Sequence, residues 1–264
     1  MKGFLPALLV GFSLVACARA QSEEARWVDT RSDVPSDAVV IFGGEDTDML
    51  VAQDGGRFNW EMKDGAIVVK PGQQERQQGL WTKLHFRDAQ IHIEFSLPKS
   101  DDPGTKATNS GLYFHGLFEL QIIDGFENPM DAKEVVGSVY NIRPPLVNAA
   151  RPTDTWQVYD IVFRAPRRDK DGVPTEAGSI TAFLNGVLVQ DHTPIIEHQS
   201  EYAPMYFRTT TYTEGILKNL LKTGVGPLQL QDHDHPVRFR NFWIRPLDDK
   251  AFMWNGKKAK RITN

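Results

Sequence analysis

Short runs of alternating or wholly apolar residues recur along the chain, whereas long helical periodicity is scarce. Side chains of a strand alternate between the two faces of a sheet, so runs of this kind predict β-strands. The predicted strands cover residues 66–70, 89–97, 111–114, 118–123, 156–165, 179–184, 187–192, 228–233 and 237–247. One helix is predicted from Glu214, because its apolar residues share a face and Gly224 can end it.

Turn signals separate these runs. Asn185-Gly186 lies between two of them, and this pair favours a tight hairpin because both central residues of a type I′ turn need a positive φ. Asp64-Gly65 is a second turn candidate, and the polar segment from Arg167 to Ala177 is predicted to be an exposed loop. Many short strands with one short helix predict an all-β fold, a sandwich or jelly roll of two antiparallel sheets.

The N-terminus carries an export signal. Lys2 precedes an apolar run from Phe4 to Ala16 that is short for a membrane span, so residues 1–20 are predicted to be a signal peptide. Two processing routes stay open. The small residues before Gln21 suit release of a soluble protein, whereas the LVAC sequence ending at Cys17 suits a lipidated protein. We therefore expect an exported bacterial protein, periplasmic or an outer-membrane lipoprotein.

Composition narrows the function classes. Hydrophobic residues make up 41% of the 264 residues, enough for a sizeable core, and one domain is predicted over residues 36–248 with a C-terminal tail over residues 249–264. The formal net charge of −4 offers no basic footprint, so nucleic acid is not an expected partner. Contact with a membrane is expected only through a possible lipid anchor at Cys17.

Several predicted strands pair an apolar face with a face of carboxylates, amides, imidazoles and guanidinium groups. Sugar hydroxyls need such partners, and a curved sheet that carries them suits a carbohydrate. We expect these polar faces to meet in one hollow, with Glu119 opening onto it near Arg240. The candidate residues from the strands and their ends are Glu119, Arg240, His233, His115, Asn109, Gln121, Tyr140, Gln231, Tyr113, Glu94 and His92.

Structural interpretations of the same residues stay open. Glu119 and Arg240 are also compatible with a cross-strand ion pair on a solvated face, and His92 and Glu94 have the same ambiguity. The four residues from Asp232 to His235 have the composition of a metal site, but neighbours on a strand point to opposite faces and one ion cannot easily collect them all. A loop and turn is the better interpretation of that segment.

The order of sequence blocks resembles one family. WEMKDGAIVV from Trp60 is followed by GLWTKLHFRDAQIHIEFSLP from Gly79, NSGLYFHGLFELQIID from Asn109 and VYNIRPPLVNAARPTDTWQVYDIVFRAP from Val139, then by ITAFLNGVLVQD and GPLQLQDHDHPVRFRNFWIRPL. This order resembles the bacterial 3-keto-disaccharide hydrolase domain over roughly residues 39–247. The resemblance implies a concanavalin-like jelly roll and substrates already oxidised at C3 by an upstream sugar 3-oxidoreductase.

The implied chemistry assigns roles to the candidates. A 3-keto group makes the C2 proton acidic, so the C1 substituent can leave by elimination, and water addition completes a net hydrolysis. Glu119 is the expected acid or base, Arg240 the partner of the enolate or of Glu119, and His233 or His115 the second proton-transfer group. The expected substrate-binding residues are Asn109, Gln121, Tyr140, Gln231, Tyr113, Glu94 and His92. A divalent metal on the ketone is a variant, with His92, Glu94 and His233 as candidate ligands.

Rival functions stay open as well. A glycosidase with two carboxylates would pair Glu119 with Glu94 or Asp124, but Gln121 stands where related enzymes of this fold carry a middle acid. A carbohydrate-binding module on the same fold is the main alternative to an enzyme, and a surface structural protein is the third.

Overall fold

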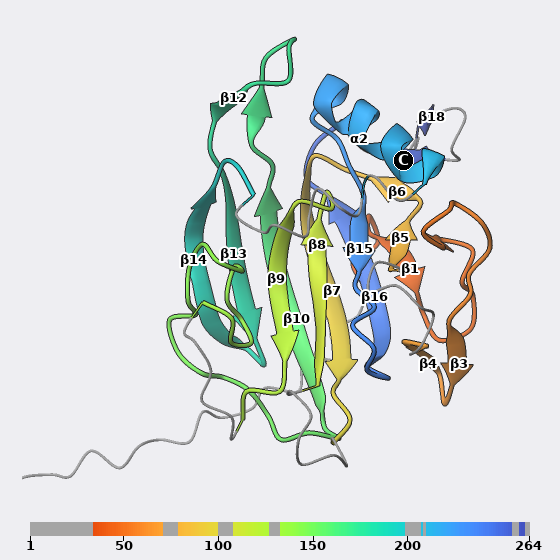
Figure 1. Ribbon diagram of the computed structural model, residues 1–264, viewed down its shortest axis with the longest axis vertical. Helices are drawn as coiled ribbons and strands as arrows, with labels where there is room; N and C mark the ends of the chain where they lie inside the picture. Colours follow the sequence, from red (N-terminus) through yellow and green to blue (C-terminus); the bar gives the residue numbers. More distant parts are fainter. Residues whose placement is uncertain are drawn as a thin grey trace, which may run out of the picture.

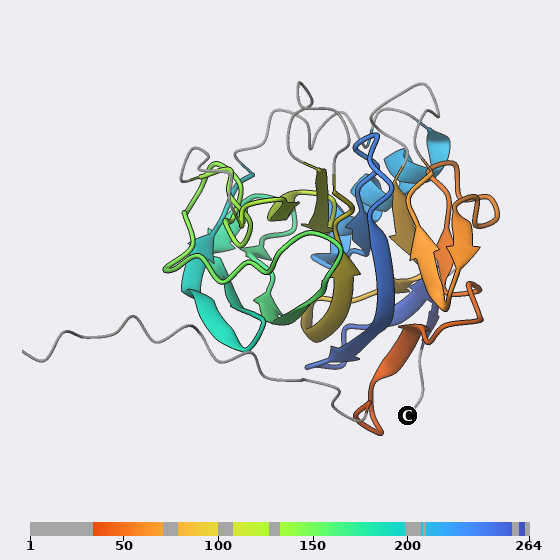
Figure 2. The same ribbon diagram turned by 90° about the horizontal axis from the view of Figure 1, so that it is seen from below.

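The computed structural model describes residues 34–70, 79–99, 108–126, 133–198, 207, 210–254 and 259–261. The predicted signal peptide and Cys17 lie outside these residues. Two antiparallel sheets form the body of the protein, and they are seen as two layers in Figures 1 and 2. Among the described residues, no helix is long and apolar enough to cross a membrane.

The larger sheet has eight strands. In spatial order they are β14 (Val187–Ile195), β13 (Gly178–Leu184), β10 (Trp156–Arg164), β7 (Asp88–Ser96), β16 (Arg238–Pro246), β4 (Ala66–Val68) and β3 (Glu61–Lys63), with β1 (Val39–Phe42) also paired to β16. The pairing of β7 with β10 is continuous from Trp156 opposite Ser96 to Arg164 opposite Asp88. The pairing of β7 with β16 is interrupted between Arg240 and Trp243, where Asn241 has a φ of 45°.

The smaller sheet has five strands, in the order β2 (Leu50–Val51), β5 (Leu80–Thr82), β15 (Leu228–Leu230), β8 (Asn109–Phe114) and β9 (Phe118–Ile123). Residues 137–140 run along the outer edge of β9. There Gln121 N–H donates to the carbonyl of Ser138, and Tyr140 N–H donates to the carbonyl of Glu119.

The core lies between the two sheets. Phe114 of β8 stacks on Phe163 of β10 with ring centroids 4.9 Å apart. The Tyr159 hydroxyl of β10 donates to the backbone carbonyl of Gln121 in β9 at 2.7 Å. The apolar residues of each sheet therefore point toward the other sheet, and the alternate residues point away from the shared core. The predicted all-β sandwich with one short helix is confirmed.

The predicted turns are confirmed by the backbone. Asn185 and Gly186 have φ values of 54° and 81°, and Asp64 and Gly65 have values of 51° and 70°. Each pair joins two antiparallel strands, β13 to β14 and β3 to β4. The predicted helix is α2 (Thr211–Thr223), with Thr210 as its N-cap and Gly224, at a φ of 68°, as its C-cap.

Two segments differ from their prediction. Residues 249–264, predicted as a tail, contain β17 (Phe252–Trp254) and β18 (Ala259–Arg261), and β17 pairs with β6 (Leu84–His85). The polar segment from Arg167, predicted as a loop, forms a two-stranded ribbon of β11 (Arg167–Arg168) and β12 (Pro174–Glu176). Apolar residues such as Phe252 explain the first difference, because their rings pack on the buried His85.

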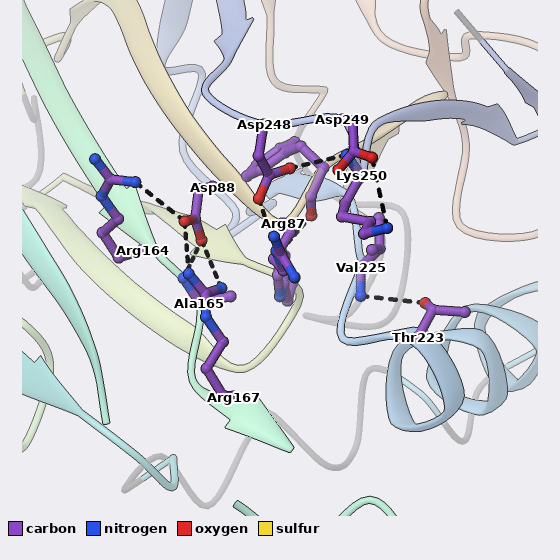
Figure 3. Close-up of polar contacts among 12 residues, drawn as sticks. Arg87, Asp88, Arg164, Ala165, Arg167, Thr223, Val225, Asp248, Asp249 and Lys250 are labelled. Atoms are coloured by element: carbon purple, nitrogen blue, oxygen red, sulfur yellow. Dashed lines mark hydrogen bonds and ion pairs between the residues drawn. The ribbon is translucent and has the colours of Figure 1, made fainter. Parts of the chain in front are cut away.

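A buried carboxylate ties the end of β10 to the start of β7 (Figure 3). Asp88 accepts hydrogen bonds from the Arg167 guanidinium at 2.7 and 2.9 Å, from Arg164 at 3.1 Å and from the Ala165 N–H at 3.1 Å. Burial opposes ionisation of Asp88, but these bonds outweigh it, so the pKa of Asp88 lies below its ordinary value. The ionised Asp88 side chain therefore links the start of β7 to the end of β10 within the large sheet.

Candidate active site

One row of side chains crosses the five-stranded sheet on the face that points away from the core. Glu119 in β9 lies opposite Tyr113 in β8. Tyr113 lies opposite Gln229 in β15, and Gln229 lies opposite Trp81 in β5. At the other end of the row, Tyr140 is the neighbour of Glu119 across the edge of β9. Strand pairing thus brings residues from four parts of the sequence into one line.

A second row lies one step along the same strands. Gln121 lies opposite Gly111, and Gly111 is bonded through its carbonyl to the N–H of Gln231. Ser138 extends this row beyond β9. Because side chains on one face recur at every second residue, both rows share the polar face of the sheet. In Figure 1, β9, β8 and β15 lie in front of β7 and β10, so this face is turned away from the large sheet.

Glu119 is held in a buried position on this face. Its side chain is 5% exposed, and the Tyr113 hydroxyl donates to its Oε2 at 2.6 Å. The pKa of Glu119 is raised to about 8, mainly by burial; the hydrogen bond from Tyr113 acts against this rise, and the nearby Glu134 adds a smaller contribution to it. Glu119 is therefore mainly protonated at neutral pH and can donate a proton.

Amide groups on the same face have unused hydrogen-bonding capacity. Both side-chain polar atoms of Gln229, which is fully buried, lack a partner among the described residues, and so does Oε1 of the 3% exposed Gln121. Oδ1 of Asn109, at the start of β8, is in the same state. Buried polar groups are nearly always hydrogen-bonded, and each exception calls for an explanation. A polar ligand with several hydroxyls would supply the missing partners.

His233 lies at the edge of this polar face, beyond the end of β15. Its ring is stacked on that of His235 at 6.2 Å, and Nδ1 of His235 accepts the N–H of Asn109 at 3.3 Å. Burial raises the pKa of the neighbouring Asp232 to about 6. The loop after β15 thus adds titratable groups beside Asn109 and Gln231.

The structure separates Arg240, Glu94 and His92 from Glu119. Phe239 and Phe95 are paired across β16 and β7 and belong to the core, so their sequence neighbours Arg240 and Glu94 point to the outer face of the large sheet. Glu119 lies on the outer face of the other sheet. The expectation that Arg240 stands beside Glu119 is wrong, because strand alternation assigns a face but not the sheet to which a strand belongs.

These three residues form a separate network. Arg240 Nε donates to Glu94 Oε2 at 2.6 Å, and its guanidinium lies 3.9 Å from the ring centroid of Trp156. The Asn241 amide donates to Glu94 Oε1 at 3.0 Å and lies 3.2 Å from His92 Nε2. His92 Nδ1 lies 2.7 Å from Asp160 Oδ1. With both nitrogens of His92 and both oxygens of Glu94 satisfied, the network stabilises the large sheet.

His115 is also placed away from the polar face. It is 2% exposed in the turn between β8 and β9, its Nε2 lies 2.8 Å from the carbonyl of Phe86, and its ring packs edge-on against Phe163 at 4.9 Å. Burial lowers the pKa of His115 to about 4. A neutral core histidine cannot exchange protons with a ligand near Glu119, so its predicted role as a proton-transfer group is wrong.

The candidate metal ligands do not come together. His92 and Glu94 lie on the large sheet and His233 follows β15 of the small one, with the core between them. No group of three or more His, Cys, Asp or Glu side chains in the described part of the chain is placed to hold a metal ion. The residues proposed for a metal therefore do not fit one.

Sequence reasoning missed Ser138, and it did not include Gln229 and Trp81 in the expected site, although Gln229 alternates along a predicted strand and Trp81 is a candidate stacking aromatic. Gln229 carries the same period-2 signal as Gln231, and Ser138 could not be found because residues 137–140 have no strand pattern. Trp81 is fully buried: its indole N–H donates to Gln53 at 2.6 Å, and Phe207 packs on it at 5.7 Å. It is therefore a support for the face, not an open stacking platform.

Comparison with known families gives a match over most of the chain. Residues 37–245 match the model of the 3-keto-alpha-glucoside-1,2-lyase-like domain. The chain belongs to this family. Membership confirms the resemblance found in the sequence and supports an enzyme that acts on carbohydrates.

Several solved structures are similar to this chain. A candidate glycosyl hydrolase from Parabacteroides distasonis is 33% identical, with 81% of this chain and 85% of that chain covered and a TM-score of 0.66. A second one from the same organism is 20% identical, with coverages of 80% and 94% and a TM-score of 0.53, and it bears on the fold alone. No curated protein matches the chain significantly.

Proposed function

We propose that this protein is an exported enzyme that cleaves the glycosidic bond of 3-keto-glycosides such as 3-keto-disaccharides. The observation that carries the proposal is the buried, mainly protonated Glu119, held by Tyr113 on a face where the amides of Gln121 and Gln229 have polar atoms without a partner among the described residues. Membership in a family named for a 3-keto-glucoside 1,2-lyase supports the substrate class, because elimination across C1 and C2 needs the ketone at C3.

The reaction has two halves. A base removes the proton from C2, the electrons of that C–H bond form the double bond between C1 and C2, and the C1–O bond breaks with its electrons going to the departing oxygen. That oxygen takes a proton from an acid. Addition of water then places oxygen on C1 and hydrogen on C2, so the net result is hydrolysis.

The polar face supplies groups for each task. Glu119 is the proton donor to the departing oxygen, because burial keeps its carboxyl protonated at neutral pH. His233, at the edge of the face, is the second proton-transfer group. The amide of Gln229 is a donor for the ketone oxygen of the bound substrate and for the enolate oxygen that develops from it, in the role first expected of Arg240. Gln121, Gln231, Asn109 and Tyr140 hold sugar hydroxyls.

The cellular setting belongs to the same proposal. The apolar N-terminal run after Lys2 supports export, with soluble release or lipidation at Cys17 as the two routes. A substrate oxidised at C3 requires an oxidoreductase that acts before this enzyme. In this proposal the glycoside is first oxidised at C3 by the oxidoreductase, and the present enzyme then cleaves the glycosidic bond.

Reaction of a 3-keto-disaccharide in heavy water tests the proposal. We expect free 3-keto-sugar with deuterium at C2, because proton removal and return at that carbon exchange the hydrogen with solvent. Product that retains its original hydrogen at C2 would indicate direct displacement. Binding without any release would favour a carbohydrate-binding module.

A further inference from the structure

Gly111 lies beside a hydrogen-bonded group of three side chains, those of Glu119, Tyr113 and Gln231. Glu119 Oε2 accepts the Tyr113 hydroxyl at 2.6 Å, and the Gln231 amide donates to the same hydroxyl at 3.4 Å. Gly111 sits in β8 two residues before Tyr113 and opposite Gln121. The side chains of Glu119 and Gln231 lie close to this position, which is the one position in the middle of β8 that has no side chain.

A methyl group at this position would occupy the place of the carboxyl. A Cβ on Gly111 would lie 2.3 Å from Glu119 Oε1, 3.1 Å from Glu119 Cδ and 3.2 Å from Gln231 Oε1. An ordinary contact begins near 3.4 Å, so the carboxyl oxygen would have to move by about 1.1 Å (3.4 minus 2.3). The carboxyl of Glu119 thus lies against the bare backbone of β8.

The backbone itself does not require glycine here. Gly111 lies inside a regular strand and outside the left-handed region, where several other glycines of this chain are found. Alanine is normally better than glycine in a strand interior, since glycine loses more conformational freedom on folding. The three nearest atoms to the added Cβ are all side-chain atoms. What glycine provides at this position is therefore space for Glu119.

We propose that Gly111 is a positioning residue: its missing side chain forms the seat that holds the Glu119 carboxyl in contact with Tyr113. The consequence for catalysis rests on the function proposed above, whereas the seat itself does not. A displacement of about 1 Å in a reacting group can lower a rate by about 100-fold. Gly111→Ala is therefore expected to lower kcat by about 100-fold while KM changes less than about threefold.

Thermal unfolding of paired variants tests the seat without any assay of activity. Overpacking predicts that Gly111→Ala lowers Tm by roughly 3–10 °C in the native background. The same loss is expected in a Glu119→Gln background, because glutamine keeps the volume. In a Glu119→Ala background the loss should disappear, because the seat is empty. Gly43→Ala is the matched control, since its Cβ would meet only Val40, at 3.4 Å, and no change is expected.

Two results would overturn the proposal. One is an equal effect of Gly111→Ala on Tm in all three backgrounds, which would show that the methyl group does not meet Glu119. The other is a full kcat for Gly111→Ala in an active enzyme. If the native protein releases no sugar from 3-keto-glycosides, the proposed function fails, and the Tm comparison still decides whether the seat exists.

Discussion

The Tyr113 hydroxyl lies 2.6 Å from Oε2 of Glu119, on the face of the small sheet that points away from the core. Both residues are almost completely buried. The carboxyl therefore loses the solvation that would keep it ionised, while the hydroxyl fixes one of its oxygens in space. Position and protonation state of Glu119 are set by neighbours that lie next to it across the strand pair.

Tyr113→Phe is predicted to move the alkaline limb of the pH profile upward. The hydroxyl bond lowers the pKa of Glu119 against the larger effect of burial, so its loss raises that pKa above about 8. Because the protonated form is the proton donor, ionisation of Glu119 produces the alkaline limb of kcat/KM, and this limb should shift to higher pH by roughly one unit. A profile of kcat/KM against pH checks this, and a shift to lower pH would contradict the assignment of Glu119 as the acid.

Gln229→Leu is predicted to stabilise the free protein and to weaken substrate binding. The buried amide of Gln229 has no hydrogen-bond partner among the described residues, and an unpaired buried group costs about 1–3 kcal/mol. Leucine removes that cost but cannot bond to sugar, so KM should rise about tenfold or more. Tm and KM measured together test the trade-off. A lower Tm with an unchanged KM would show that Gln229 has only a structural role.

Arg240→Ala is predicted to lower stability while leaving kcat within about twofold of the native value. Its ion pair with Glu94 is 2.6 Å long, but the side chain of Arg240 is 37% exposed and Asn241 also bonds Glu94. The expected loss is about 1–2 kcal/mol, reduced by solvent screening. Urea unfolding and turnover rates measure the two effects. A large loss of kcat with normal stability would place Arg240 in the site after all.

Asp88→Asn is predicted to lower Tm at neutral pH and to have a smaller effect in acid. The pKa of Asp88 is below its ordinary value, so the ionised carboxylate stabilises the fold at every pH above the unfolded pKa of about 4. This stabilisation is lost as the pH falls through the lower pKa of the folded protein. The difference in Tm between the native protein and the variant should therefore shrink below about pH 4. A difference that grows in acid would have the wrong sign for a lowered pKa.

From the sequence, the strands and the residues on each of their faces could be predicted more reliably than the pairing of the strands into sheets. The predicted strand at 118–123 coincides with β9, and its alternation places Glu119 and Gln121 together. Alternation also correctly places Glu94 and His92 on the same face of one strand. It contains no information on which strands share a sheet, and that long-range pairing decides that Arg240 meets Glu94 and not Glu119.

Local turns and burial explain the other differences. His115 follows β8 directly, so its sequence position resembles that of a site residue, but a φ of 55° turns the chain there and its ring packs in the core. Gly111 shows the reverse case. A glycine within a strand pattern signals a close approach by something else, and only the structure reveals that the approaching group is the carboxyl of Glu119.

Turnover by two matched variants, Glu119→Gln and Glu94→Gln, tests most directly which outer face carries the chemistry. Both replace a buried carboxyl by an amide of the same size, one on each sheet. With a 3-keto-disaccharide as substrate, we expect Glu119→Gln to lower kcat by about 10²–10⁴-fold and Glu94→Gln to retain turnover. Full activity in folded Glu119→Gln, together with loss of activity in folded Glu94→Gln, would contradict the account and move the site to the large sheet.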